Sequence, residues 1–386
     1  MNPVAPPPDD LSPLRKPAFQ KAISDLEELM TQSGRAFLLG AGCSKCAGLP
    51  LTAELTDKCL TSACLDSTTK DILQAVRQEF DGATSANIED LLSEIIDLLA
   101  IADRRATRGA KNAHVVITSK TFTTEQLRDA CEHIKNAIVE VLDQEVTIEK
   151  HWDFIRAVHR PLRPGKSVLP KPVDYLVLNY DTLIEDALAL EKLTYADGMD
   201  GGLTAWWDSA TLSKTALCAR VIKLHGSINW CELADDPLPR RVSTSLKLPA
   251  NTRRKVLIWP ASTKYRETQR DPYAQLATRM RAILRPSDGS QTVLMICGYS
   301  FGDSHINLEI DKALHESDGQ LTVVCFTFDD KPEGQLKEWF DNDSVREQVR
   351  IYSKKGFFHA DVQETSTVDL PWWKFENITR LLEGKR

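Results

Sequence analysis

The sequence predicts an α/β protein built on a doubly wound parallel sheet with a largely helical insertion. Short apolar runs alternate with segments of helical periodicity, which is the pattern of parallel strands joined by helices. Four of these runs, at residues 36–39, 174–178, 221–224 and 292–297, end directly in glycine or polar side chains. Residues just beyond the carboxyl ends of parallel strands line the ligand crevice of such sheets. The pattern that predicts the fold therefore also predicts where a ligand would bind.

The first apolar run, at residues 36–39, leads into a turn suited to a phosphate group. Gly40-Ala41-Gly42 follows it at once, and a helical pattern begins near Leu51. Glycines let the backbone approach an anion closely, and unpaired N–H groups at a helix start face it with partial positive charge. The full dinucleotide fingerprint would need a third glycine where Lys45 stands. An ordinary turn between strand and helix therefore stays an alternative for this stretch taken alone.

Helical patterns dominate the rest of the amino-terminal half. Residues 1–16 are rich in proline and predict a flexible arm. Apolar stripes at helical spacing predict helices that begin near Pro17, Asn87, Thr124 and Ile148. Only a brief strand signal at 115–117 interrupts the helical patterns that follow residue 60. We therefore predict a helical insertion over residues 61–168.

The second half of the chain alternates strands with less regular segments. Residues 191–220 predict a loop or hairpin, and the polar residues 232–256 predict an irregular excursion. Residues 256–260 predict a strand at the edge of the crevice, and 320–326 predict the last clear strand. Residues 331–386 carry only weaker helical signals, and we predict that they form a C-terminal extension.

Three later strand ends carry polar residues toward the same edge as the glycine turn. They are Asn179-Tyr180-Asp181, His225-Gly226 and Gly298-Tyr299-Ser300. Asn179 or Asp181 could simply cap the helix that follows. A lone histidine is also more often a core or surface group than a catalyst. The argument for a site depends on all of these segments meeting at one edge.

The charge and composition of the chain argue against several classes of protein. The net charge of -7 argues against nucleic-acid binding driven by bulk charge. No apolar run approaches the roughly 20 residues of a membrane span, and residues 1–14 lack the features of a secretory signal. We therefore expect a cytoplasmic protein that does not attach to membranes.

The nine cysteines predict reduced thiols rather than disulfides or a zinc module. Cys43 and Cys46 form the only CxxC pair, whereas a zinc ribbon needs a second pair at suitable spacing. Cys218 and Cys231 are too far apart to supply it, so we predict no metal site. Redox chemistry at Cys43 and Cys46 is the alternative, but nothing else in the chain resembles a thioredoxin unit.

In their order and spacing, the four segments resemble the sirtuin family. In the family the four segments read GAGxS, NID, HG and GxS, and SGIP follows the first of them. This chain has Gly40-Ala41-Gly42-Cys43-Ser44, Ala47-Gly48-Leu49-Pro50, Asn179-Tyr180-Asp181, His225-Gly226 and Gly298-Tyr299-Ser300. It looks closest to the sirtuin-like domains of prokaryotic anti-phage defence proteins, which carry segments of the types LNYDTLIE, KLHGS and GYSFxD, found here at 178–185, 223–227 and 298–303. The resemblance covers about residues 30–60 and 170–330.

The resemblance implies a Rossmann-like domain over residues 17–60 and 169–330 that takes NAD as its substrate. It assigns catalysis to Asn179 and His225, with His225 as general base. The residues that it assigns to NAD binding are Gly40, Ala41, Gly42, Ser44, Asp181, Gly226, Gly298 and Ser300. Among these, the glycine loop would hold the diphosphate, Asp181 would lie at the nicotinamide end, and Ser300 would contact the adenosine half.

These residue types suit cleavage of the nicotinamide–ribose bond. Nicotinamide leaves as a neutral base, so the barrier lies in a ribosyl centre of oxocarbenium character. An amide such as Asn179 can orient the ribose or a water without adding charge. A histidine can deprotonate the nucleophile, which typically contributes ~10²–10⁴-fold in rate.

The chain departs from the protein deacylases of the sirtuin family. Those proteins insert a four-cysteine zinc module after the HG segment, whereas residues 227–300 here contain only Cys231 and Cys297. We therefore expect no acyl-lysine cleft, water as the nucleophile, and hydrolysis of NAD to ADP-ribose and nicotinamide.

An unregulated NAD hydrolase would kill its host cell, so we expect gating by assembly or by a partner. The resemblance points to an abortive-infection effector that forms a homo-oligomer or pairs with a HerA-type ATPase. The main alternative is a regulatory module that binds NAD or ADP-ribose without turnover. A deacylase ranks lower. A nuclease subunit also ranks lower, because its only support is two groups of basic residues, at 104–111 and 240–254, and any nucleic-acid contact would be indirect.

Overall fold

A mixed sheet of nine described strands forms the centre of the fold. The computed structural model describes residues 9–31, 34–80, 82, 86–160, 171–233, 236–243, 245–246, 271–286 and 289–384. In spatial order, the strands within these residues are β15 (Val362–Thr365), β14 (Gly356–His359), β13 (Val349–Ser353), β12 (Leu321–Thr327), β11 (Thr292–Cys297), β1 (Gly34–Leu39), β4 (Val173–Val177), β8 (Ala219–Lys223) and β5 (Tyr195–Ala196).

The strands from β13 to β5 run parallel, and β1 lies between β11 and β4. The chain begins the sheet at β1, builds outward through β4 and β8, and returns to the other side of β1 with β11. Strand order therefore reverses at β1, and this kind of switch point is where open α/β sheets bind ligands. The predicted α/β fold class is confirmed.

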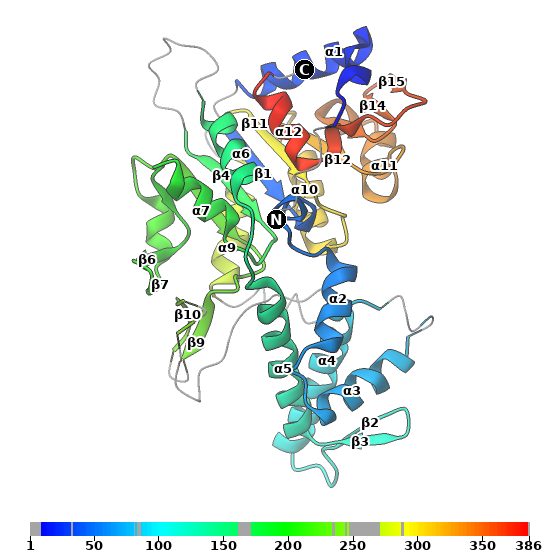
Figure 1. The fold of residues 1–386 in the computed structure, drawn as a ribbon, viewed down its shortest axis with the longest axis vertical. Helices are drawn as coiled ribbons and strands as arrows, with labels where there is room; N and C mark the ends of the chain where they lie inside the picture. The colour runs from blue at the N-terminus through cyan, green and yellow to red at the C-terminus, as the bar shows by residue number, and fades with distance from the viewer. Residues whose placement is uncertain are drawn as a thin grey trace, which may run out of the picture.

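Helices cover both faces of the sheet (Figure 1). Phe37 and Leu39 belong to one core and Ala36 and Leu38 to the other, because side chains alternate along a strand. The first core is closed by α1 (Pro17–Leu29), α6 (Glu149–His159), α7 (Leu183–Leu190) and α12 (Phe375–Leu382). The second is closed by α9 (Tyr273–Leu284), α10 (Ser304–Glu316) and α11 (Gly334–Asp341).

A helical unit projects away from the sheet (Figure 1). It consists of α2 (Thr52–Thr61), α3 (Ser67–Gln78), α4 (Ile88–Thr107), α5 (Thr124–Leu142) and the hairpin of β2 (Val115–Ile117) and β3 (Lys120–Phe122). Capping boxes at Asn87 and Thr123 fix the starts of α4 and α5, as the sequence predicts. The predicted helix near Ile148 also forms, as α6. It lies within the predicted insertion, but its Phe154 packs in the core of the main sheet.

The two chain ends differ from expectation. We predicted residues 320–326 as the last clear strand, but β13, β14 and β15 extend the main sheet beyond it. The arm predicted as flexible over residues 1–16 is docked from Asp9 onward. Leu11 and Leu14 are buried in the core, and Asp9 accepts hydrogen bonds from Lys374 and Asn377. These contacts join residues at opposite ends of the chain, so local sequence patterns do not reveal them.

A second, antiparallel sheet lies beside the main one. It contains β6 (Met199–Gly201), β7 (Ala205–Trp207), β10 (Asp236–Arg241) and β9 (Trp230–Leu233). The excursion predicted over residues 232–256 therefore begins as paired strands. The strand predicted at 256–260 lies outside the described residues. Within the described part of the chain, no helix has the length and apolarity needed to cross a bilayer.

Candidate functional site

The four predicted segments follow β11, β1, β4 and β8, which are consecutive neighbours in the sheet. Backbone hydrogen bonds keep these strand ends in line. The N–H of Gly40 donates to the carbonyl of Cys297, and the N–H of Leu178 donates to that of Leu39, each at 3.0 Å. The N–H of Leu224 donates likewise to Val177 at 3.0 Å. The structure thus brings all four segments to one edge.

The glycine loop packs directly against the turn at Gly298. The N–H of Gly42 donates to the carbonyl of Gly298 at 2.9 Å. A Cβ on Gly40 would lie 2.5 Å from the carbonyl oxygen of Gly298, and a Cβ on Gly298 would lie 2.4 Å from the nitrogen of Cys43. Gly298 also has φ of 61°, in the left-handed region. These glycines are therefore required by the contact between two turns, whether or not an anion approaches them.

The loop differs locally from the expected strand–turn–helix unit. Two short 3₁₀ turns, Ala41–Cys43 and Lys45–Ala47, follow β1 before the chain reaches α2 at Thr52. No long helix therefore begins directly behind the glycines. Ala41 and Ser300 are exposed at this edge, whereas Ser44 is buried.

A buried hydrogen-bond network joins the glycine loop to the end of β4. The Ser44 hydroxyl donates to Oδ2 of Asp181 at 2.6 Å, and the Asn179 amide donates to the Ser44 oxygen at 2.7 Å. Oδ1 of Asp181 accepts the N–H of Leu183, the first residue of α7, at 3.1 Å. Asp181 therefore supports the helix start and binds Ser44 at the same time. The carbonyl oxygen of Asn179 is buried and has no hydrogen-bond partner among the described residues.

His225 follows β8 and is 5% exposed. Gly226 has φ of 87°, which lets the backbone turn sharply there. The imidazole of His225 stacks on that of His305, with ring centroids 5.7 Å apart and an interplanar angle of 28°. Our sequence reasoning missed His305, although it stands at the start of α10, soon after the polar turn that ends the strongest strand pattern.

Residues on both sides of His225 tie it to the turn that carries Asn179 and Asp181. The ammonium of Lys223 donates to the backbone carbonyl of Asp181. The Ser227 hydroxyl and the Ile228 N–H both donate to the carbonyl of Tyr180, at 3.2 and 2.9 Å. The two predicted catalytic residues are thus held by neighbouring turns that bond to each other.

A buried ion pair lies beneath this edge. Lys223 is 1% exposed, and its nitrogen lies 3.5 Å from Oε1 of Glu185 on α7. Burial raises the pKa of the Glu185 carboxyl to about 7, although the Lys223 charge opposes the shift. A carboxyl group with a raised pKa therefore lies directly beneath the candidate site.

The cysteines near the site are poorly placed for redox chemistry or for metal binding. The Cys43 thiol donates to the carbonyl of Cys297 at 3.2 Å, and burial raises its pKa well above the usual value. Burial also raises the pKa of Cys46 to about 12. All nine cysteines are free thiols. Across the described ranges, no group of three or more His, Cys, Asp or Glu residues could hold a metal ion.

Comparison with known proteins agrees with this arrangement in part. Residues 174–347 match the family model of the SIR2-like domain. That range contains the segments of Asn179, His225 and Gly298 but not the glycine loop. No curated protein matches the chain.

Among solved structures, one similar chain is a mutant of Sir2 homologues in complex with 2'-O-acetyl ADP ribose. It is 13% identical, the match covers 94% of this chain and 96% of that one, and the TM-score is 0.39. The family match suggests an NAD-related function. Together, the family match and the strand order of the parallel sheet support a sirtuin-like α/β fold for this chain.

Proposed function

We propose that this protein hydrolyses NAD at the nicotinamide–ribose bond and releases ADP-ribose and nicotinamide. The observation that carries the proposal is the side-chain carbonyl oxygen of Asn179, which is buried at the carboxyl edge of the parallel strands and has no hydrogen-bond partner among the described residues. Buried polar atoms are nearly always hydrogen-bonded, so an acceptor at a ligand edge that no described residue satisfies is suited to a donor on a bound ligand. The SIR2-like match over residues 174–347 supports a dinucleotide as the source of that donor.

In this proposal Asn179 orients the reacting groups. Its amide donates to Ser44, which leaves the carbonyl oxygen to accept a hydrogen bond from a ribose hydroxyl or from the attacking water. A fixed amide adds orientation without adding charge. Asp181 lies in the same network, and its carboxylate can stabilise the positive charge that develops on the ribosyl carbon.

The reaction breaks the bond between the ribosyl C1' and the pyridinium nitrogen, and the electron pair leaves with neutral nicotinamide. Water forms the new bond to C1', and its proton passes to the imidazole of His225. Stacking on His305 would hold the ring of His225 in one orientation. Ala41 and Ser300, which are both exposed, would contact the diphosphate and the adenosine half, respectively.

We further propose that the activity serves cytoplasmic anti-phage defence by abortive infection. Control would come from homo-oligomer assembly or from a HerA-type ATPase partner. The support for this part is the resemblance of the sequence segments to defence proteins. Assays should therefore include the chain alone, the chain at high concentration, and the chain with a candidate ATPase.

Nicotinamide release from NAD tests the proposal, with Asn179→Ala and His225→Ala beside the parent protein. Asn112→Ala and His315→Ala are matched controls, because both residues are exposed in the folded chain. We expect release by the parent and both controls, and loss of release in both site variants. Release that persists in both site variants would overturn the site. NAD binding without cleavage under every condition would favour the regulatory module, and release only with an acetylated peptide would favour a deacylase.

A further inference from the structure

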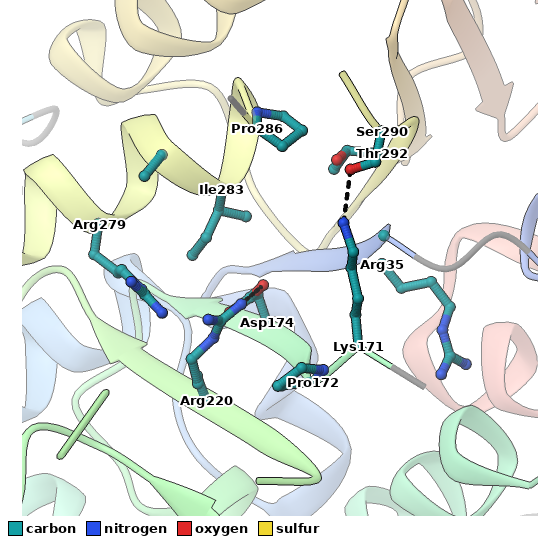
Figure 2. Close-up of a pocket in the computed structure, with 12 residues that line it drawn as sticks. Arg35, Lys171, Pro172, Asp174, Arg220, Arg279, Ile283, Pro286, Ser290 and Thr292 are labelled. Carbon is teal, nitrogen blue, oxygen red and sulfur yellow. Dashed lines mark hydrogen bonds and ion pairs between the residues drawn. The ribbon is translucent and has the colours of Figure 1, made fainter. Parts of the chain in front are cut away.

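A cavity of about 150 Å³ lies at the amino edge of the main sheet, opposite the edge that carries Asn179 and His225. Figure 2 shows the side chains around it. Its floor is formed by residues at the starts of four neighbouring strands, β11, β1, β4 and β8, and α9 closes one side. The residues that define it are Gly34, Asp174, Arg220, Thr292, Arg279 and Ile283.

One carboxylate faces two guanidinium groups in this cavity. Nε and Nη2 of Arg220 donate to the two oxygens of Asp174, at 2.5 and 2.6 Å. Arg279 reaches in from α9, and its guanidinium lies beside that of Arg220 (Figure 2). Within the described residues, Asp174 is the only carboxylate that lines the cavity. The lining therefore carries a surplus of positive charge.

Arg279 has an N–H donor that no described residue uses. Its Nη2 donates to the carbonyl of Leu212 at 2.9 Å, but its Nε is buried and has no hydrogen-bond partner in the described part of the chain. Burial and the adjacent charge of Arg220 both lower the pKa of Arg279, although the Asp174 carboxylate opposes the shift. Arg35 contributes only its stem, because its guanidinium turns away to the carbonyl of Val158.

We propose that this cavity binds a small phosphate-bearing anion between Arg220 and Arg279. Guanidinium groups present planar forks of N–H donors that match phosphate oxygens, and a doubly charged oxyanion would offset the surplus charge. The volume is well below the roughly 300–1,000 Å³ of sites that enclose drug-sized ligands. The cavity therefore suits a phosphate or pyrophosphate group rather than a whole dinucleotide. This site is independent of the proposed NAD cleavage.

Calorimetric titration of the full chain with inorganic pyrophosphate, at constant ionic strength, tests the proposal. Arg279→Gln removes the free donors but leaves the Arg220–Asp174 pair intact, so the variant should fold. Loss of charged hydrogen bonds of this kind should weaken binding at least roughly tenfold. Arg281→Gln on the same helix is the matched control, because Arg281 pairs with Glu309 outside the cavity. Arg281→Gln and Asn179→Ala should both bind like the parent.

Asp174→Asn supplies a second test, in which affinity should increase. The substitution frees Arg220 from its ion pair and should tighten pyrophosphate binding.

A parallel titration with AMP distinguishes a free inorganic anion from the phosphate group of a larger molecule. Binding of pyrophosphate alone indicates a free inorganic anion, and binding of both indicates the phosphate end of a larger molecule. Absence of binding to the parent protein, or equal weakening in Arg279→Gln and Arg281→Gln, would overturn the proposal.

Discussion

The hydroxyl of Ser44 donates a hydrogen bond of 2.6 Å to the carboxylate of Asp181, although 137 residues separate the two along the chain. Both side chains are buried, and both lie where parallel strands end. Ser44 also accepts the amide of Asn179, so its one hydroxyl fixes two side chains of the candidate site. A single small residue in the glycine loop thus sets the geometry at the end of β4.

Replacing Ser44 with alanine should loosen both Asn179 and Asp181. A buried carboxylate that loses a donor typically costs about 1–3 kcal/mol of unfolding free energy. The rate of nicotinamide release should fall by more than the loss of folded protein explains, because Asn179 loses its fixed orientation. Denaturant unfolding and the NAD assay measure the two effects. Ser344→Ala removes an exposed hydroxyl that bonds Asn342, and it should change neither.

Replacing Gly298 with alanine should destabilise the protein by at least about 2 kcal/mol, through left-handed strain and overlap with Cys43. Gly302→Ala is the matched control in the same turn. A Cβ at Gly302 would meet nothing nearer than the Ser300 hydroxyl at 3.6 Å. Midpoints of chemical denaturation compare the two variants. Equal midpoints would show that the two turns do not pack as tightly as described.

The buried Glu185 contributes a component of the stability that decreases as pH rises toward neutrality. Its folded-state pKa of about 7 lies above the value of 4.5 for a free glutamate, so the folded protein holds this proton more tightly. The stabilisation is complete below pH 4.5 and is lost as pH rises through 7, by about 3 kcal/mol at most. Glu185→Gln should remove this component from a series of unfolding curves. Asp186→Asn, an exposed change on the same helix, should leave the parent pH dependence intact.

Two buried histidines of α6 contribute a component of the stability that decreases as the solution becomes more acidic. Burial lowers the pKa of both His151 and His159 to about 4, whereas free histidine titrates near 6.5. Unfolded chains therefore take up protons that the folded protein excludes, and stability is lost as pH falls from 6.5 to 4. Each histidine contributes about 3 kcal/mol at most to this loss.

Unfolding curves of His151→Gln and His159→Gln, collected across that pH range, should show a shallower acid loss than the parent. His315→Gln is an exposed control on another helix. Hydrogen exchange adds a local test, because α6 should lose protection before the sheet does. A parent-like acid slope in both variants would contradict this account.

Sequence patterns predicted the parallel strands and the candidate site because the signals are local. Each apolar run is followed at once by its own glycine or polar residue, and the register of a parallel sheet then brings these ends together. Asn179, Asp181 and Ser44 meet for this reason. His305 was missed because its proximity to His225 depends on how α10 packs against the sheet, and no local pattern encodes that packing.

The carboxyl-terminal strands were missed for a different reason. β13 and β14 are short, and β15 is fully exposed, so no long apolar run marks them. Their stability comes from partners distant in sequence. The Tyr352 hydroxyl donates to the carbonyl of Ala22, and Trp372 donates to that of Ser353. Local sequence patterns did not predict the charged cavity at the opposite edge either, because it is formed by residues from five separate elements.

Tyr180 connects the helical unit to the candidate site. It stands between Asn179 and Asp181 in the chain, but its ring packs in the core of the helical unit and its hydroxyl donates to Glu89 on α4 at 3.1 Å. A movement of the helical unit would therefore shift the side chains of Asn179 and Asp181, because Tyr180 shares their stretch of backbone. Removing the helical unit would expose the Tyr180 ring to solvent and remove the contacts that hold this stretch of backbone in place.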